Sequence, residues 1–403
     1  MSSSDIIIFM KKKSFLSHKE MRLQTLLKII EAIKNNATSK RDIQNTTKLS
    51  WGTVSEGINF FYKKEIIVTL DKNNKNNKVG RRTLSYDFNP KKYLTMGMEI
   101  KPHEIVCSLV NLGNEELHNG KYPFREKLNL NNIFKLIKSA FLHMLKEDSF
   151  HIENIIGLTF SLSGALDKGN LIWIKTPRFP EIDNIKFNNL FSLLPSIKYI
   201  CIEHDINTLA MSIMSKYHWH DNNYLFLHIS DGIGMAIVDD DVFFLGSRGF
   251  AGEIGHIPYV FHQNKLRCHC GQNNCLETVL STKGIISYMQ KRYNKKSKYF
   301  SKILVDLSEE QKKNVFIDYI HPPLLFLCTI AANLFDPQTI ILGGKAIEPW
   351  LDKLQKSFKE HLRSKTWLSS PNHLKLYKEK ESNCAYGSTI QANKNIIKKL
   401  LKH

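Results

Sequence analysis

Residues 252–277 read GEIGHIPYVFHQNKLRCHCGQNNCLE. Three of the chain's seven cysteines, Cys268, Cys270 and Cys275, lie within eight residues of this stretch. His256 stands twelve positions before the first of them. Tetrahedral zinc takes thiolate and imidazole ligands of this kind, at bond lengths of about 2.0–2.3 Å. Four protein ligands leave no open coordination position, so the pattern predicts a structural zinc site and no catalytic metal.

The fourth ligand has competitors, because His262 and His269 lie in the same stretch. Gly271 allows a tight bend between the second and third sulfur atoms. The alternative is a set of three free thiols. In a reducing compartment a tight cysteine cluster indicates a metal before it indicates a disulfide.

The length and charge of the chain indicate how many domains it has and what kind of partner it binds. A chain of 403 residues predicts more than one domain. Lys and Arg number 57 against 38 Asp and Glu, a net charge of +19. Residues 1–92 carry 19 basic and 8 acidic side chains, so +11 of this charge is in less than a quarter of the chain. Such an excess is typical of a surface that binds nucleic acid phosphates, although a solvated Lys/Asn-rich face would have the same composition.

No secretory signal is evident, and no run reaches the roughly 18 apolar residues that span a bilayer. The longest candidate, residues 322–335, is shorter and contains Thr329 and Asn333. We therefore expect a soluble cytoplasmic protein without a membrane partner.

The first quarter of the chain has the pattern of a helix-turn-helix. Apolar residues recur at helical spacing from Met21 to Ile33, and a short second helix is predicted over residues 41–46. Ser50 is a good N-cap for a third helix. In this motif the start of the last helix enters the major groove. The residues predicted to contact DNA from this helix are Ser50, Trp51, Thr53, Ser55 and Asn59.

A β-hairpin wing is predicted after these helices, from residues 66–70 and 83–88. Arg81 and Arg82 follow Gly80 near its base, where they would reach a minor groove or phosphates. The alternative for the whole segment is a small protein-docking module. Topology, polar face and charge together favour DNA.

Strands and helices alternate from Tyr93 onward, which predicts an α/β class. Carboxylates accept hydrogen bonds from hydroxyl groups, so Asp205, Glu253 and Glu277, on loops around the cysteine cluster and at a predicted strand end, are candidate ligand-binding residues. Taken singly, each is as well explained as a helix cap or a surface charge.

The chain as a whole resembles the ROK family of repressors and sugar kinases, in particular its NagC/XylR-type repressor branch. The motifs that carry the resemblance are AGEIGH (251–256), CHCGQNNCLE (268–277), SLSGALD (161–167), EHDIN (203–207), DGIG (231–234), ILGG (341–344) and AYGSTIQA (385–392). Asn274 replaces a glycine that the family has in its cysteine motif. The predicted winged helix is similar to that of the family's repressors and is absent from its plain kinases.

The resemblance implies an N-terminal winged helix-turn-helix followed by a two-lobed, ribonuclease-H-like (actin/hexokinase-type) sugar kinase fold. The implied domains are a flexible extension (1–20), a DNA-binding domain (21–90) and an effector domain (91–403), with lobe 1 at about 93–215 plus the C-terminal helix and lobe 2 at about 216–385. It implies that His256, Cys268, Cys270 and Cys275 bind zinc. It also implies that Asp205, Glu253, His256 and Glu277 surround a sugar in the cleft between the lobes.

The kinase motifs of the family are altered here. At the place of its first phosphate loop, Asp-x-Gly-Gly-Thr, the chain has Glu99-Ile100-Lys101-Pro102-His103. The second loop, Gly-Thr-Gly-x-Gly, reads Ser230-Asp231-Gly232-Ile233-Gly234. A phosphate cradle needs free N–H groups and small residues, and an acidic side chain repels phosphate. Asp205 is then a vestigial base, and we expect no catalytic residues and no kinase activity.

The sugar site also departs from the family, because Arg178 stands where an asparagine usually holds sugar hydroxyls, and His204 replaces the asparagine before Asp205. Arg178 would bind a phosphate or carboxylate on the ligand, or would fill the cleft by pairing with Glu181 or Asp183. The effector is therefore a sugar phosphate, an acidic sugar, a neutral sugar, or none.

The leading hypothesis is a sugar-responsive repressor of a carbohydrate operon, of the xylose or amino-sugar type. A homodimer or homotetramer would read a palindromic double-stranded operator. The first alternative is an ATP-dependent sugar kinase with a DNA-binding head. The second is a repressor whose sugar cleft is inactive and which a protein partner controls.

Overall fold

The computed structural model describes residues 17–70, 84–147, 150–176, 178–219, 221–260, 266–355, 357, 373–378 and 383–402. Two compact units divide the chain. The first comprises Met1–Leu94, Asn111–Glu115 and Asn393–His403, and the second comprises Thr95–Val110 and Glu116–Ala392. Each unit is described by itself below.

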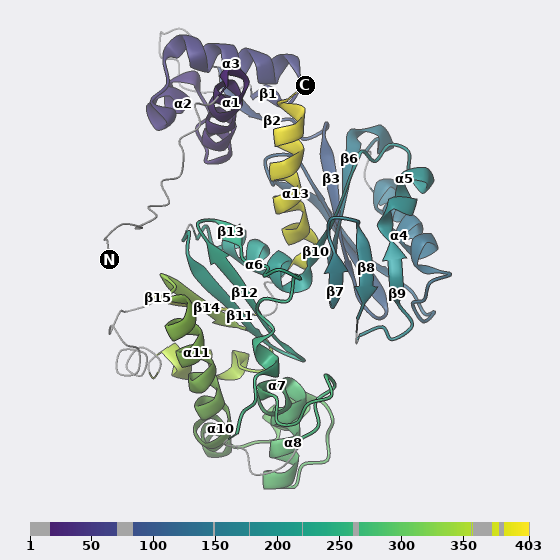
Figure 1. Ribbon diagram of the computed structural model, residues 1–403, viewed down its shortest axis with the longest axis vertical. Coiled ribbons are helices and arrows are strands. Elements are labelled where there is room, and N and C mark those ends of the chain that lie inside the picture. Colours follow the sequence, from purple (N-terminus) through teal and green to yellow (C-terminus); the bar gives the residue numbers. More distant parts are fainter. Residues whose placement is uncertain are drawn as a thin grey trace, which may run out of the picture. The chain divides into compact units, whose positions relative to one another are not determined.

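The first unit starts with three helices followed by a two-stranded antiparallel sheet (Figure 1). Its elements are α1 (His18–Lys34), α2 (Lys40–Thr47), α3 (Trp51–Lys63), β1 (Ile67–Leu70) and β2 (Ser85–Phe88). Each helix begins after a serine whose hydroxyl oxygen accepts a backbone N–H three residues on, which satisfies one of the free donors of the first turn. These caps explain why the helices begin at Ser17, Ser39 and Ser50.

A small apolar core holds the three helices together. Ile29 of α1, Ile43 of α2 and Phe61 of α3 are fully buried, as are Val54 and Ile58. The helical spacing of these residues places them on one stripe of each helix. The three helices agree with the predicted helix-turn-helix, and Val54, Ile58 and Phe61 of α3 face its core.

The first lobe of the second unit is a five-stranded sheet in the order β10-β6-β3-β4-β5, and the predicted α/β class is confirmed. Its elements are β3 (Leu94–Ile100), β4 (Glu104–Val110), β5 (Glu116–Pro123), α4 (Ile133–Glu147), β6 (Ile155–Leu162), β10 (Tyr199–His204) and α6 (Asp205–Lys216). Strands β3, β4 and β5 are antiparallel neighbours, whereas β10 and β6 are parallel. A small sheet of β7 (Ala165–Asp167), β8 (Ile172–Lys175) and β9 (Asp183–Lys186) follows β6.

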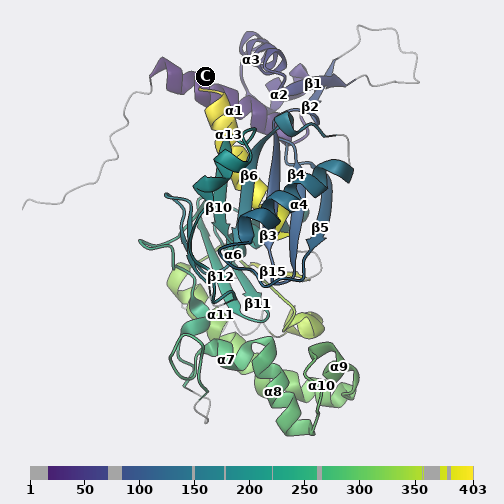
Figure 2. The same cartoon turned by 90° about the vertical axis from the view of Figure 1, so that its right-hand side faces the viewer.

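The helix α13 (Cys384–Leu400) begins against this sheet, where Ser388 forms a 2.7 Å hydrogen bond with Thr159 of β6. Gly97 of β3 permits this approach, because a β-carbon there would overlap the carbonyl of Ala385. Figures 1 and 2 place α13 and α4 on different sides of the sheet, so both faces are covered.

The second lobe is a five-stranded sheet in the order β13-β12-β11-β14-β15. Its strands are β11 (Tyr224–Ile229), β12 (Ile233–Asp239), β13 (Val242–Phe243), β14 (Thr339–Gly343) and β15 (His373–Tyr377). Between β13 and β14 the chain forms the short turn η3 (Ile254–His256) and the helices α7 (Leu276–Leu280), α8 (Thr282–Tyr293), α9 (Phe300–Val305), α10 (Glu309–Val315) and α11 (His321–Phe335). Strands β11, β14 and β15 are parallel, as in α/β sheets that bind ligands at strand ends.

One helical stretch, Glu309–Phe335, is long and apolar enough to cross a membrane by length and composition. Here many of its apolar residues, among them Phe316, Leu324 and Cys328, are buried in the core of the second lobe. The stretch is also interrupted by a π-helical turn over Phe316–Ile320, next to two prolines, which lack the backbone N–H. It is packed as a core helix.

Candidate effector and metal site

The predicted zinc ligands lie together in the second lobe. The ligand atoms of His256, Cys268, Cys270 and Cys275 all lie within 4.8 Å of one another. The Sγ of Cys268 is 3.6 Å from Nδ1 of His256, and the Sγ atoms of Cys270 and Cys275 are 3.6 Å apart. Ligands about 2.0–2.3 Å from a tetrahedral zinc ion are separated by roughly 3.5–3.8 Å. The donor set therefore fits zinc in number, type and spacing.

Local backbone structure explains how one loop brings three sulfur atoms close together. Gly271, at φ +96°, turns the chain back so that its N–H donates to the carbonyl of Cys268. Asn274, which occupies the family's glycine position, also has a left-handed φ of +56°, a conformation that asparagine tolerates. Its side-chain oxygen accepts the N–H of Leu266 at 2.8 Å. The substitution thus keeps the turn and adds a hydrogen bond within it.

The two ring nitrogens of His256 face different groups. Nδ1 faces Cys268, while Nε2 lies 3.8 Å from Oε2 of Glu253. A metal on Nδ1 would leave Nε2 as the nitrogen that carries the proton, pointing toward the acidic residues. The ring therefore connects the metal position with the carboxylates.

Of the two other histidines in this stretch, the structure describes His269. Nδ1 of His269 is 3.9 Å from Sγ of Cys268 but only 3.2 Å from Oε1 of Glu277, so its nearer partner is the carboxylate. His256, His269 and Glu277 form a second group with metal-ligand spacing. His262 lies outside the described residues.

Three of the predicted sugar-binding residues are acidic, and they come from separate parts of the chain. Asp205 begins α6, Glu253 precedes η3, and Glu277 lies in the first turn of α7. Burial raises the pKa of Glu253, and the negative charges of Asp205 and Glu277 raise this pKa further, against the lowering effect of His256. Asp205 and Glu277 are therefore each within electrostatic reach of Glu253. A ligand between them would meet three groups that accept hydrogen bonds from hydroxyls.

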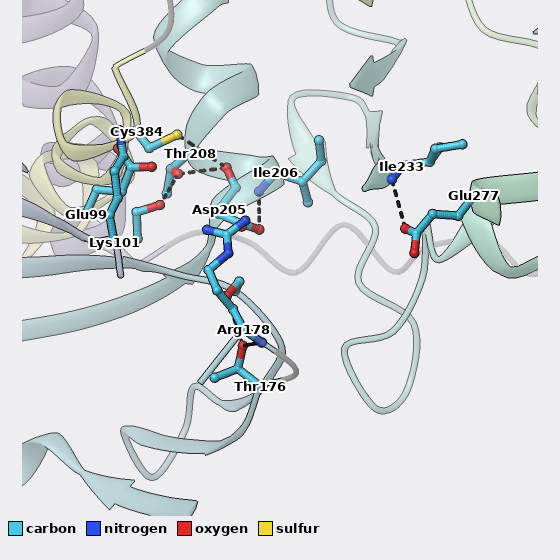
Figure 3. Close-up of polar contacts among 12 residues, drawn as sticks. Glu99, Lys101, Thr176, Arg178, Asp205, Ile206, Thr208, Ile233, Glu277 and Cys384 are labelled. Atoms are coloured by element: carbon cyan, nitrogen blue, oxygen red, sulfur yellow. Dashed lines mark hydrogen bonds and ion pairs between the residues drawn. The ribbon is translucent and has the colours of Figure 1, made fainter. Parts of the chain in front are cut away.

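Arg178 points toward Asp205 from the turn after Thr176 (Figure 3). Its Nη2 lies 4.0 Å from Oδ2 of Asp205, and its side chain is 44% exposed. One of the two alternatives for Arg178 was pairing with Glu181 or Asp183; in the described part of the chain its ion pair is with Asp205 instead. Sequence reasoning missed the Asp205 pairing, because β9 and β10 lie between the two residues in the chain.

A second pair of opposite charges lies beside this one (Figure 3). Nζ of Lys101 is 3.3 Å from Oε2 of Glu99, whose side chain is 15% exposed. Burial raises the pKa of Glu99, and the Lys101 charge opposes this rise. Lys101 thus places a fixed cation on a carboxylate at the position where the family's kinases have a glycine.

The loop Ser230–Gly234 is engaged by an acidic side chain as well. The backbone N–H of Ile233 donates to Oε2 of Glu277 at 3.0 Å, and a β-carbon on Gly232 would lie 3.1 Å from the same oxygen. A carboxylate thus takes an N–H that a phosphate cradle would use.

His204, the other departure in the sugar site, lies with its Nε2 atom buried and without a hydrogen-bond partner among the described residues. Burial lowers its pKa, whereas Glu203 and Asp205 act in the opposite direction. Glu203 is neutralised by Nζ of Lys168 at 2.6 Å.

A cavity of about 420 Å³ lies elsewhere in the second lobe and is bordered by Phe300, Lys345 and Leu351 among other residues. None of the predicted sugar-binding residues borders it.

The DNA-contacting residues predicted on this helix run from its N-cap, Ser50, to Asn59, past the middle of α3. Ser50 caps the helix, with its Oγ accepting the N–H of Thr53 at 3.1 Å. Trp51 is 53% exposed, Asn59 is exposed, and Thr53 and Ser55 are partly exposed. The structure leaves this face available for a partner. Arg81 and Arg82 lie outside the described residues.

A helix-turn-helix head and a two-lobed α/β body of the sugar-kinase type define a class of two-part transcriptional regulators. The chain belongs to the ROK family, whose model matches residues 95–395.

Its relatives include repressors. The xylose repressor of Bacillus subtilis (strain 168) is 25% identical over 335 residues, which cover 82% of this chain and 83% of that protein. The DNA-binding transcriptional dual regulator NagC of Escherichia coli (strain K12) is 24% identical over 284 residues, covering 67% and 68%.

Solved structures agree on the fold. A ROK family transcriptional regulator, described as a homologue of the E. coli MLC protein, superposes with a TM-score of 0.75 at 18% identity, covering 94% of this chain and 98% of that one. A ROK hexokinase from Thermus thermophilus has a TM-score of 0.60 at 17% identity and covers 75% of this chain and 99% of its own. The predicted winged-helix head and sugar kinase fold are confirmed.

Proposed function

We propose that this protein is a sugar-responsive transcriptional repressor of a carbohydrate uptake or utilisation operon. The observation that carries the proposal is the placement of Asp205 and Glu277 within electrostatic reach of Glu253, in a body preceded by a helix-turn-helix whose first turn exposes Trp51. The carboxylates would bind sugar hydroxyls, with His256 donating from the ring nitrogen that faces Glu253. The names of the relatives suggest xylose or N-acetylglucosamine as the type of inducer.

DNA binding is assigned to the head. Ser50, Trp51, Thr53, Ser55 and Asn59 would enter the major groove, and Arg81 and Arg82 would contact the minor groove or phosphates. A homodimer or homotetramer would read two half-sites of a palindromic operator in the cytoplasm. We assign residues 21–90 to this role, 91–403 to sensing, and 1–20 to an extension.

Zinc is assigned a structural role at His256, Cys268, Cys270 and Cys275. When bound, it would fix the loop that carries Glu253 and the tautomer of His256. The four ligands leave zinc no open position for a substrate.

Phosphoryl transfer is not part of the proposal. Two features support the absence of phosphoryl transfer. Lys101 places its ammonium group beside Glu99, and Glu277 accepts the hydrogen bond of the Ile233 N–H. A kinase needs a positioned phosphoryl donor as well as the base at Asp205.

Footprinting of the purified protein on DNA upstream of its own gene tests the proposal. We expect protection of an inverted repeat that weakens when D-xylose or N-acetylglucosamine is added. Protection that no sugar alters would favour control by a protein partner. Formation of sugar phosphate from ATP, Mg²⁺ and either sugar would instead support the kinase alternative.

A further inference from the structure

The acidic residues of the effector site are already engaged by donors from the chain itself. Glu277 accepts from the Ile233 N–H at 3.0 Å and lies 3.2 Å from Nδ1 of His269. Oε2 of Glu253 is 3.8 Å from Nε2 of His256. A sugar hydroxyl that binds the same oxygen of Glu277 would therefore compete with an internal partner, whereas the Glu253 side chain is 60% exposed.

Asp205 has the most replaceable partner. Its Oδ1 accepts the N–H of Ile206 at 2.9 Å, a local bond that a ligand need not disturb. Within the ranges that the structure describes, the ion pair of its Oδ2 is with Arg178, at 4.0 Å, the longest of these contacts, and the Arg178 side chain is 44% exposed. Among the described residues Arg178 forms no other ion pair. Figure 3 shows the guanidinium directed at the Asp205 carboxylate.

The balance of charge argues against a negatively charged ligand at this position. Four carboxylates, those of Glu99, Asp205, Glu253 and Glu277, surround or adjoin the site, and the lysine and arginine side chains in contact with them are Lys101 and Arg178. Lys101 is held by Glu99 at 3.3 Å. An anion that drew Arg178 away from Asp205 would uncover one more negative charge beside itself, whereas an uncharged hydroxyl would not be repelled.

We propose that Arg178 is a specificity-determining residue that occupies the Asp205 carboxylate in the ligand-free protein, and that the effector is a neutral sugar whose hydroxyl displaces the guanidinium. The proposal rests on the proposed function and names both the ligand class and a residue that sets the affinity. Arg178 lowers affinity for every neutral sugar by the free energy of its contact with Asp205. Exposed ion pairs have energies that correspond to an affinity change of about two- to five-fold.

The test is calorimetric titration of the full-length protein with D-xylose, N-acetylglucosamine, N-acetylglucosamine 6-phosphate and D-glucuronate. Arg178→Gln and Arg178→Met are compared with wild type. The methionine variant keeps side-chain length and has no group that can hydrogen-bond strongly to a sugar, so a gain in both variants cannot come from a new contact. Arg125→Gln is the matched control, because Arg125 is an exposed arginine of the same lobe outside the site.

Both Arg178 variants should bind the neutral sugar about two- to five-fold more tightly than wild type and the Arg125→Gln control. Salt provides a second readout, since raising ionic strength from about 0.05 M to about 0.5 M screens an exposed ion pair. Wild-type affinity for the neutral sugar should therefore rise with salt, and the affinity of Arg178→Met should not change.

Tighter binding of the 6-phosphate or of glucuronate to wild type than to Arg178→Met would overturn the proposal, because Arg178 would then be an anion receptor. If wild type and Arg178→Met bind the neutral sugar equally while that sugar still releases the operator, the role of Arg178 fails and the proposed function stands. If no sugar binds any variant and the footprint never responds, both fail.

Discussion

Gly252 and Asn274 show how single residues shape the site. Gly252 has a φ of +97°, and a β-carbon there would overlap the carbonyl oxygen of Met235. The chain can therefore pass close to β12 and present Glu253 directly afterwards. Asn274 has a left-handed backbone next to Cys275. Both positions depend on backbone conformations that most side chains disfavour.

Replacement of Cys270 by serine tests the metal at the scale of one residue. Cys270 is exposed, so the change removes a ligand with little loss of packing. A 100-fold loss of zinc affinity would lower the free energy of unfolding by about 2.7 kcal/mol under conditions where the metal saturates the wild type. Elemental analysis should find about one zinc per wild-type chain and a clear deficit in Cys270→Ser.

Removal of zinc with a chelator tests the same metal site. It should lower the melting temperature of wild type toward that of Cys270→Ser and leave the variant unchanged. Cys201→Ser, a cysteine outside the cluster, should retain both zinc and the chelator response. An unchanged wild-type melting curve in chelator would contradict the metal site.

Glu99 offers a prediction about pH. Burial raises its pKa in the folded protein, so between the unfolded and folded pKa values the native state binds more protons than the unfolded state. The contribution of Glu99 to the free energy of unfolding therefore falls as pH rises through that interval, starting near the ordinary pKa of 4.5. Glu99→Gln should raise the melting temperature at pH 7, and the difference from wild type should vanish below about pH 4.

The Lys101 contact is also lost in Glu99→Gln, but its lowering effect on the pKa is smaller than the effect of burial. Melting curves across pH 4–8 for both proteins check the prediction. A variant that is less stable than wild type at pH 7 would show that the ion pair with Lys101 outweighs burial.

At the scale of elements, α3 carries the prediction for DNA. Trp51 in its first turn and Tyr62 near its end are both 53% exposed, so they are matched in type and accessibility. The N-terminal residues of a recognition helix contact base edges, and Tyr62 lies beyond Asn59, the last residue predicted to contact DNA. Trp51→Ala should weaken operator binding by about 1–3 kcal/mol, roughly 5- to 150-fold, and Tyr62→Ala should have little effect.

Fluorescence anisotropy with labelled operator, together with melting temperatures of both variants, measures this difference. Equal losses for Trp51→Ala and Tyr62→Ala would show that α3 does not meet DNA through its first turn.

Some strands of the α/β body can be read directly from the sequence. Residues 94–100, 155–160 and 225–229 are apolar runs, and in the structure nearly all of their side chains are buried. Strand β5 was not predicted, because its side chains are exposed or only partly buried and do not form an apolar pattern. The small sheet β7-β8-β9 was missed for a related reason, since three or four residues are too few for periodicity.

The site residues show the same difference between contacts that are close in sequence and contacts that depend on tertiary packing. The clustering of the proposed zinc ligands was predictable because three of them lie within eight residues, where spacing alone limits geometry. The contacts of Arg178 with Asp205 and of Glu277 with Ile233 join residues from different elements. Such pairs depend on tertiary packing, which local pattern does not encode. His269 adjoins two cysteine ligands in sequence, yet its nearer partner is Glu277.

At the scale of the whole molecule, regulation requires that sugar and DNA binding be coupled. A sugar that weakens operator affinity by some factor must itself bind the operator complex more weakly by the same factor, because both describe one thermodynamic cycle. The sign follows from the proposed repressor, in which the sugar-bound state is the one that leaves the DNA. A coupling of about 1–3 kcal/mol corresponds to roughly 5- to 150-fold in either direction.

Calorimetric titration of the full-length protein with the inducing sugar, alone and saturated with operator, measures one side of the cycle. Anisotropy of labelled operator with and without saturating sugar measures the other, and the two factors should agree. A duplex of scrambled sequence at the same concentration is the control and should leave sugar affinity unchanged. If sugar releases the operator while operator leaves sugar affinity intact, the two ligands do not share a binding cycle, and the release must come from an effect outside the sugar site.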